Sequence, residues 1–108
     1  MVLTRDFKAT IQKRVQRDPA FRRELLREGI ECMLAGDVET GKTVVRDYIN
    51  ATIGFNELAE GVDSSPKTLM RMLGPRGNPQ ARNLFRILAY LIRHEGIRLE
   101  LRTATARG

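Results

Sequence analysis

The sequence predicts an all-α protein of about five to six helices, with one short strand-like segment near the C-terminus. Apolar residues recur at helical spacing along most of the 108 residues. Two prolines follow a capping side chain, in Asp18-Pro19 and Ser65-Pro66, which is the pattern of a helix start. Only residues 97–101 alternate apolar and polar side chains as a half-buried strand does.

The composition is that of an ordinary globular chain, with 42% hydrophobic and 30% charged residues. Its length fits one domain with a single core. We divide that domain into a helical extension at residues 1–36, a central core at residues 37–95, and a strand-like segment and mobile tail at residues 96–108.

The extension is expected to contain two helices. Thr4 opens the first, whose narrow apolar edge places it on the surface of the domain or against a partner. Asp18 caps the second, which ends at Gly36, and Gly29 within it indicates a close contact or a slight bend. The apolar residues of the two helices are Phe7, Ile11 and Val15, and then Phe21, Leu25, Leu26, Ile30, Met33 and Leu34.

Residues 36–43 match the phosphate-binding pattern G-x-x-x-x-G-K-[ST] letter for letter. A working phosphate loop follows a buried strand, whereas the residues before it have helical spacing. Asp37 and Glu39 would also oppose a polyphosphate. We therefore favour a helix start, with Asp37 as its cap and Glu39 in its first turn. Nucleotide binding is kept as a distant alternative.

The central feature is a pair of short helical patterns between residues 54 and 73. Residues 55–60 give two helical turns, and residues 61–64 break them with glycine and aspartate. Ser65 then caps a second helix, from Pro66 to Leu73. A helix-turn-helix presents side chains to the DNA major groove in this way, although a plain helical hairpin has the same spacing.

Two longer helices flank this motif. The preceding one continues to Thr52, with Tyr48 as a mostly buried core residue. The following one runs from Gln80 to Arg93 and has Gly96 as its C-cap. Its core side is expected to consist of Leu84, Ile87, Leu88 and Leu91, with Phe85 and Ile92 beside them.

Charge is distributed unevenly along the chain. From Ser64 to His94 there is no acidic residue but there are six cationic ones, as many as the net charge of +6 for the whole chain. Solvated helix faces usually mix both signs, so a run of one sign favours a polyanion as partner. The six residues are Lys67, Arg71, Arg76, Arg82, Arg86 and Arg93.

Within this stretch the sequence resembles the phage-repressor family (Cro/repressor, or Xre) over roughly residues 44–91. The resemblance rests on Leu58-Ala59, the turn at Asp63, the Ser65 cap, and the segments GPRGNP at 74–79 and LFRI at 84–87. The whole chain is more narrowly similar to bacterial addiction-module antidote proteins, which are antitoxins of the HigA-like kind. That resemblance implies an autorepressor that binds DNA and silences a small RelE/HigB-type ribonuclease toxin.

The recognition helix supplies most of the expected DNA contacts. Ser65, Lys67, Thr68 and Arg71 are expected at the major groove, with Arg71 pairing to guanine and Thr68 meeting a thymine methyl or a phosphate. Ser65 is an alternative phosphate contact, and Arg76 and Asn78 in the following loop are phosphate contacts. Gly54 and Phe55 replace the family's usual capping and phosphate-binding residues, so Asn56 or Lys67 is expected to take over that contact.

The remaining expectations concern partners and activities. We expect a cytoplasmic homodimer on a palindromic double-stranded operator, a cognate toxin as protein partner, and no membrane contact. The strand-like residues 97–101 are expected to pair with a second copy or with a partner's sheet edge. No nucleophile–base pair or metal-ligand spacing involves Cys32 or His94, so no enzymatic activity, cofactor or metal is expected. A protein-only adaptor, with the helix-turn-helix as scaffold, is the alternative.

Overall fold

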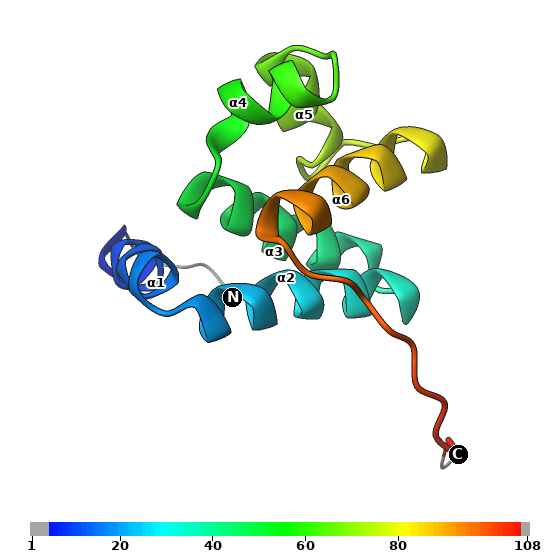
Figure 1. Cartoon of the computed structure of the whole chain (residues 1–108). Coiled ribbons are helices and arrows are strands. Elements are labelled where there is room, and N and C mark those ends of the chain that lie inside the picture. Colours follow the sequence, from blue (N-terminus) through cyan, green and yellow to red (C-terminus); the bar gives the residue numbers. More distant parts are fainter. Residues whose placement is uncertain (1–4, 107–108) are drawn as a thin grey trace.

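The computed structural model describes residues 5–106, and this part of the chain contains six helices (Figure 1). The predicted all-α class and number of helices are confirmed. Thr4 and residues 107–108 of the expected tail lie outside the described residues. The helices are α1 (Arg5–Arg17), α2 (Pro19–Leu34), α3 (Val38–Ala51), α4 (Gly54–Gly61), α5 (Pro66–Met72) and α6 (Ala81–Glu95).

Three predicted helix starts are confirmed by their caps. The side chains of Asp18, Asp37 and Ser65 each accept a hydrogen bond from the backbone N–H three residues later, at 3.1, 3.3 and 3.1 Å. Such a bond satisfies one of the amides that the first helical turn leaves without a partner. At the other end of the chain, Gly96 caps α6 with φ +74, which a residue with a Cβ rarely adopts.

One hydrophobic core joins the extension to the central helices. Leu26 and Ile30 of α2 pack with buried side chains of α3, α4, α5 and α6, and Val15 of α1 is also fully buried. Helices α1 and α2 therefore supply core to the same globule as residues 37–95, and α2 lies along α3 (Figure 1). The central helices contribute Val45, Tyr48, Ile49, Phe55, Leu58, Ala59, Val62, Leu69, Leu73, Ile87, Leu88 and Leu91.

Glycine allows the close approach of α2 and α3. A Cβ added to Gly41 would lie 2.9 Å from the carbonyl oxygen of Gly29, and one added to Gly29 would lie 2.8 Å from Val45 Cγ2. The close contact expected at Gly29 is therefore present, and the glycine offsets its cost within a helix by allowing tight packing.

A buried carboxylate ties α2, α3 and α6 together. The Glu95 side chain is 3% exposed, and Arg22 Nε lies 2.9 Å from both of its oxygens. The Tyr48 hydroxyl donates a third hydrogen bond to the same carboxylate. Burial of the ring, followed by the hydrogen bond and negative charge of Glu95, raises the pKa of Tyr48 well above its ordinary value.

Several predicted boundaries and exposures need correction. The recognition helix ends at Met72, with Leu73 as its C-cap, and the last helix begins at Ala81 and extends to Glu95. Phe85, which we placed beside the core, is 59% exposed, because it lies about 100° around α6 from the buried Ile87-Leu88-Leu91 side.

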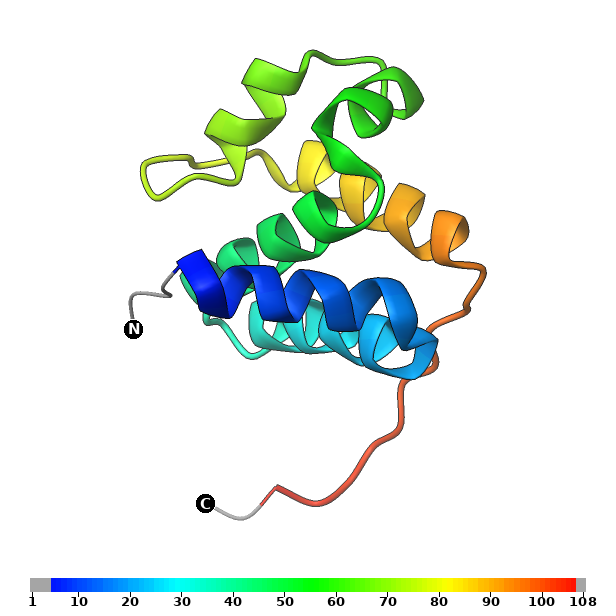
Figure 2. The same cartoon turned by 90° about the vertical axis from the view of Figure 1, so that its left-hand side faces the viewer.

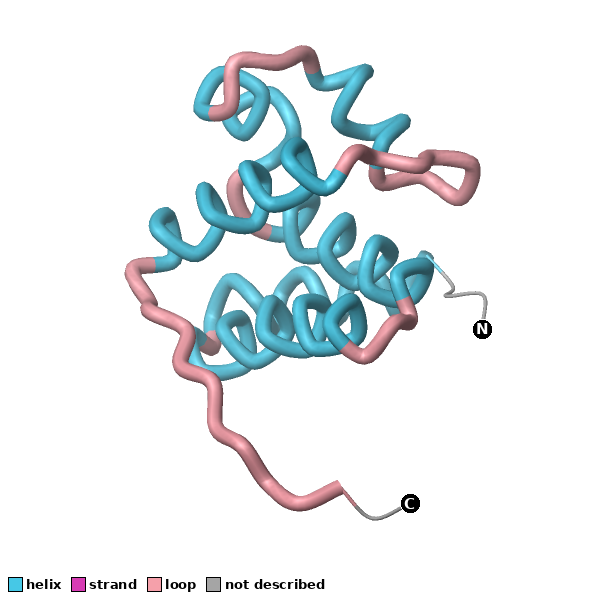
Figure 3. Tube along the Cα trace, turned by 90° about the vertical axis from the view of Figure 1, so that its right-hand side faces the viewer, coloured by secondary structure: helices cyan, strands magenta, loops and turns pink. Residues whose placement is uncertain are grey.

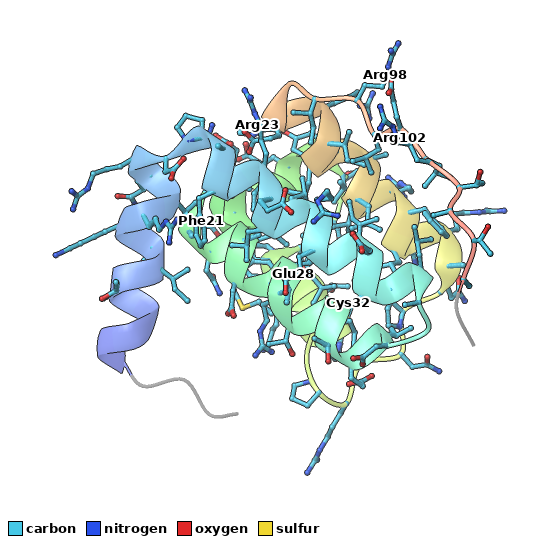
Figure 4. The ribbon with its side chains drawn as sticks, turned by 90° about the horizontal axis from the view of Figure 1, so that it is seen from below. Phe21, Arg23, Glu28, Cys32, Arg98 and Arg102 are labelled. Atoms are coloured by element: carbon cyan, nitrogen blue, oxygen red, sulfur yellow. The ribbon has the colours of Figure 1, made fainter. Side chains whose placement is uncertain are left out.

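Residues 97–106 form no regular secondary structure (Figure 3). Ile97 packs against the core, but Leu99 and Leu101 are 38% and 87% exposed. The strand-like segment 97–101 is therefore unpaired in the single chain, since no described segment offers it a ladder of backbone partners. Pairing with another chain stays a prediction. Figure 4 shows Arg98 and Arg102 of this segment alongside α2.

Candidate nucleic-acid interface

The two short helices α4 and α5 lie together at one end of the molecule, opposite α1 and α2 (Figures 1 and 2). A turn at residues 62–65 joins them, and Asp63 in this turn has φ 55. The Ser64 N–H donates to the Ala59 carbonyl at 2.9 Å, which closes the end of α4. Leu58 and Leu69 are buried beneath the pair, so α4 and α5 are two short helices joined by a turn, as the sequence predicted for this region.

The outer face of α5 is solvent-exposed and carries two cations beside an exposed methionine. Leu69 is buried, whereas Lys67, Met70 and Arg71 are exposed and Thr68 is half-buried. This division follows from helical periodicity, because residues 69, 72 and 73 face inward together. Lys67 and Arg71, four residues apart, therefore project from the same outward side of the helix.

Ser65 and Thr68 engage each other. Ser65 Oγ accepts the Thr68 N–H at 3.1 Å and lies 2.8 Å from Thr68 Oγ1. This pairing gives Ser65 a structural role as the cap of α5. It also turns the Thr68 hydroxyl toward the cap.

The loop after α5 begins with a tight turn from Gly74 to Gly77. The Gly77 N–H donates to the Gly74 carbonyl at 3.0 Å, and Arg76 sits inside the turn with its side chain exposed. A Cβ on Gly77 would overlap the carbonyl oxygens of Arg71 and Met72, so the turn lies directly on the last carbonyls of α5. Asn78 follows and is also exposed.

The start of α4 differs from the expectation. Ile53 occupies the N-cap position without a side-chain bond, and Gly54 is the first helical residue, with φ +79. A serine or threonine would be strained at this φ, which explains the glycine. Phe55 is 6% exposed and belongs to the core, so it does not meet solvent, whereas the neighbouring Asn56 does.

Residues 36–43, which match the phosphate-loop pattern, do not form a phosphate-binding loop after a strand. They span the end of one helix and the first turn of α3, with no preceding strand. Lys42 is 1% exposed, and its Nζ lies 3.1 Å from the Gly74 carbonyl, 2.7 Å from the Gly77 carbonyl and 2.9 Å from Glu39 Oε2. All three N–H donors of the ammonium thus have an acceptor within the chain, which argues against nucleotide binding.

The cations of the acid-free stretch are all exposed, and within residues 9–106 none of them takes part in an ion pair. Arg86 alone among them has an internal contact, donating to the Val62 carbonyl at 2.7 Å. The cations in question are Lys67, Arg71, Arg76, Arg82, Arg86 and Arg93.

The predicted site residues thus fall into two groups. Asn56, Lys67, Arg71, Arg76 and Asn78 are exposed at one end of the molecule without a polar partner in the described chain, whereas Ser65 and Thr68 pair with each other. The sequence analysis missed the structural contacts of two cations, the buried Lys42 and the exposed Arg86, which donate to backbone carbonyls beside this surface. Only the match to the phosphate-loop pattern marked Lys42, and it suggested another role.

Two surveys of the described residues complete the description of the site. No group of three or more His, Cys, Asp and Glu side chains among them is arranged to hold a metal ion. Nor does any helix in this range combine the length and apolar character needed to cross a membrane. In comparisons with known proteins, no family model, curated protein or solved structure matches the chain.

Proposed function

We propose that this chain is a sequence-specific DNA-binding transcriptional regulator that inserts α5 into the major groove. The observation that carries the proposal is the outer face of α5, where Lys67 and Arg71 are exposed and unpaired on a capped helix within a stretch free of carboxylates. Duplex DNA supplies the missing negative charge in a regular array.

Each side chain has a role in this arrangement. Arg71 pairs with the O6 and N7 acceptors of a guanine, the commonest specific contact in the major groove. Lys67 and Asn56 contact backbone phosphates at the start of the motif, and Arg76 and Asn78 do so from the loop. Phosphate contacts fix register without reading sequence, so specificity rests mainly on Arg71 and Thr68.

The expected binding form is a homodimer on a palindromic operator. One α5 reads a short half-site, and two copies related by a twofold axis read half-sites about 34 Å, or a multiple of it, apart. Bringing two copies together also doubles the phosphate contacts, and with them the dependence of binding on salt.

The resemblance to addiction-module antidotes supports a further part of the proposal, that this regulator is the antitoxin of a type II toxin–antitoxin pair and represses its own operon. Residues 98–106 support it as a docking segment, because none of them makes a backbone–backbone hydrogen bond within the described chain. Ile30 and Leu34 of α2 line a groove of about 440 Å³ with Leu99 and Leu101. Protease sensitivity of residues 97–101 in every assembly state would count against docking there.

The test of DNA binding is fluorescence anisotropy with a labelled duplex from the DNA upstream of this chain's own operon. A scrambled duplex of the same length is the control, and both are measured at about 50 and 200 mM salt. We expect at least about a thousandfold preference for the operator duplex. Equal, steeply salt-dependent binding to both duplexes would show a nonspecific basic surface and contradict the proposal.

The second candidate function is a protein-only adaptor. The exposed Leu34 and Leu101 at the groove favour it, since they are 63% and 87% exposed at a site away from α5. A partner complex that resists salt, together with no affinity for either duplex, would select this function over DNA binding.

A further inference from the structure

We infer that Lys42 is a positioning residue for the proposed DNA contact of Arg76, acting from inside the protein through the Gly74–Gly77 turn. The inference rests on the proposed function for its DNA part, and on geometry alone for its structural part. Lys42 is the lysine of the phosphate-loop pattern, but its side chain binds protein carbonyls in place of a phosphate.

The contacts join both ends of one turn to one ammonium group. Lys42 Nζ lies 3.1 Å from the first carbonyl of the turn, Gly74, and 2.7 Å from the last, Gly77. The same Gly74 oxygen accepts the Gly77 N–H that closes the turn. Holding both carbonyls from one point fixes the turn as a rigid unit, and Arg76 is its third residue.

The position of the ammonium also suits the end of α5. Gly77 lies directly on the carbonyls of Arg71 and Met72, where a helix presents its partial negative charge. The buried ammonium holds the carbonyls of Gly74 and Gly77, and so stabilises the turn that covers this helix end. Glu39, on the preceding turn of α3, lies 2.9 Å from Nζ and balances the charge.

Consequently, α3 sets where Arg76 projects relative to the outer face of α5. Without Lys42, two carbonyls of the turn would lose a charged donor in a buried place, and the turn would open to find water. Arg76 would then sample many positions and lose the advantage of being fixed before it meets a phosphate.

The first test uses the unaltered chain and an amine-acetylating reagent, with mass spectrometry as readout. The chain has four lysines, Lys8, Lys13, Lys42 and Lys67. We expect Lys42 to react at least about tenfold more slowly than the exposed Lys13 and Lys67. Equal rates would overturn the inference. In the presence of operator duplex, Lys67 becomes protected if DNA binding holds, so the two proposals fail separately.

The second test compares hydrogen exchange in Lys42→Met and Lys13→Met, which remove the same charge from a buried and an exposed site. In Lys42→Met, the Gly77 amide should exchange about tenfold faster or more, while amides in the middle of α2 keep their rates. Lys13→Met should leave both regions unchanged. An unchanged Gly77 amide in folded Lys42→Met would overturn the inference.

The third test is a double-mutant cycle of Lys42→Met with Arg76→Ala, measured by duplex affinity. If Lys42 acts through Arg76, Lys42→Met should weaken duplex binding by about tenfold in the natural chain and by less than about twofold in the Arg76→Ala background. Additive losses would mean that Lys42 does not act through Arg76. If the natural chain binds no duplex, the proposed function fails, and acetylation and exchange alone decide whether Lys42 holds the turn.

Discussion

The arginines of α2 and the cations of α5 and α6 have different surroundings. Arg22 and Arg23 lie against Glu95, and Arg27 bridges Glu24 and Glu31 on its own helix. The exposed Lys67 and Arg71 of α5, and the arginines of α6, have no carboxylate beside them anywhere in the described chain. The arginines of α2 thus lie in ion pairs, whereas the lysine and arginines of α5 and α6 do not, although Glu57, Glu60 and Asp63 are exposed on α4 and the turn after it.

This difference separates charges that serve stability from charges that are free to meet a partner. Figure 4 labels Arg23 and Glu28, which lie on α2, a helix that carries side chains of both charge signs along its length. A surface of mixed sign attracts no particular ion. The lysine and arginines of residues 64–94 instead form no ion pair in the described chain, which supports DNA as the proposed partner.

The largest expected effect comes from breaking the buried ion pair. Glu95→Ala removes the acceptor of both Arg22 and the Tyr48 hydroxyl, and we expect the free energy of unfolding to fall by about 3 kcal/mol. Urea unfolding followed by circular dichroism measures it. Duplex affinity of the folded fraction should stay the same, and a loss below about 1 kcal/mol would show that the network adds little.

Replacing a cation of the acid-free stretch 64–94 should have the opposite effect: it should reduce DNA recognition and leave stability almost unchanged. Arg71→Ala should cost about 1–3 kcal/mol of discrimination at one base pair, since a bidentate contact is lost. Its unfolding free energy should change by less than about 0.5 kcal/mol, because Arg71 is exposed and unpaired. Anisotropy with a panel of singly substituted duplexes provides the measurement.

Arg76→Ala is the matched control for Arg71→Ala. It should weaken binding to all duplexes alike and reduce the slope of log affinity against log salt by about one. If both variants lose affinity uniformly across the panel, the separate roles assigned to these two arginines are wrong.

A smaller effect is expected from removal of the Tyr48 hydroxyl, which donates a hydrogen bond to Glu95. Tyr48→Phe should lower the free energy of unfolding by about 1 kcal/mol at neutral pH, through the loss of one hydrogen bond to a charged acceptor. Thermal unfolding at pH 7 measures this change, and an unaltered stability would mean that solvent replaces the hydroxyl without cost.

The same tyrosine makes stability depend on alkaline pH. Its pKa is raised in the folded chain, whereas in the unfolded chain it ionises near pH 10. The unfolded state therefore binds fewer protons above pH 10, and stability is full below that pH and falls as pH rises through the folded pKa. Urea unfolding between pH 8 and 11 should show a shallower decline in Tyr48→Phe than in the natural chain.

The smallest effect is expected from the exposed ion pairs of α2, which can be compared with the buried pair of Arg22 on the same helix. Arg27→Ala removes two ion pairs whose members are all more than half exposed in their side chains. Exposed pairs contribute little, because water and salt screen them. We expect no measurable shift of the urea midpoint, and a shift as large as that of Glu95→Ala would remove the distinction between buried and exposed partners.

Local signals predicted the helices well. Asp18, Asp37 and Ser65 each bond an amide three residues away, so the sequence within one turn contains all the information that the start of the helix requires. The exposure of Lys67 and Arg71 likewise follows from the period of α5. DNA binding, the dimer and the toxin remain predictions.

Contacts between distant residues could not be predicted in this way. Arg22 and Glu95 are 73 positions apart, and Lys42 reaches carbonyls 32 and 35 positions later. No periodicity encodes such pairs, because they depend on how whole helices pack. The alternation at 97–101 shows a related limit, since it describes one segment but does not identify the neighbouring chain with which a strand would pair.

Residues 36–43 match the phosphate-loop pattern, but four of them have separate and unrelated structural roles. Gly36 has φ +93, Gly41 lets two helices approach, Lys42 holds a remote turn, and Thr43 donates to the Glu39 carbonyl at 3.1 Å. In a randomised library selected for folding, these positions should therefore vary independently of one another. The residues of a true nucleotide cradle would covary, because a single ligand constrains all of them together.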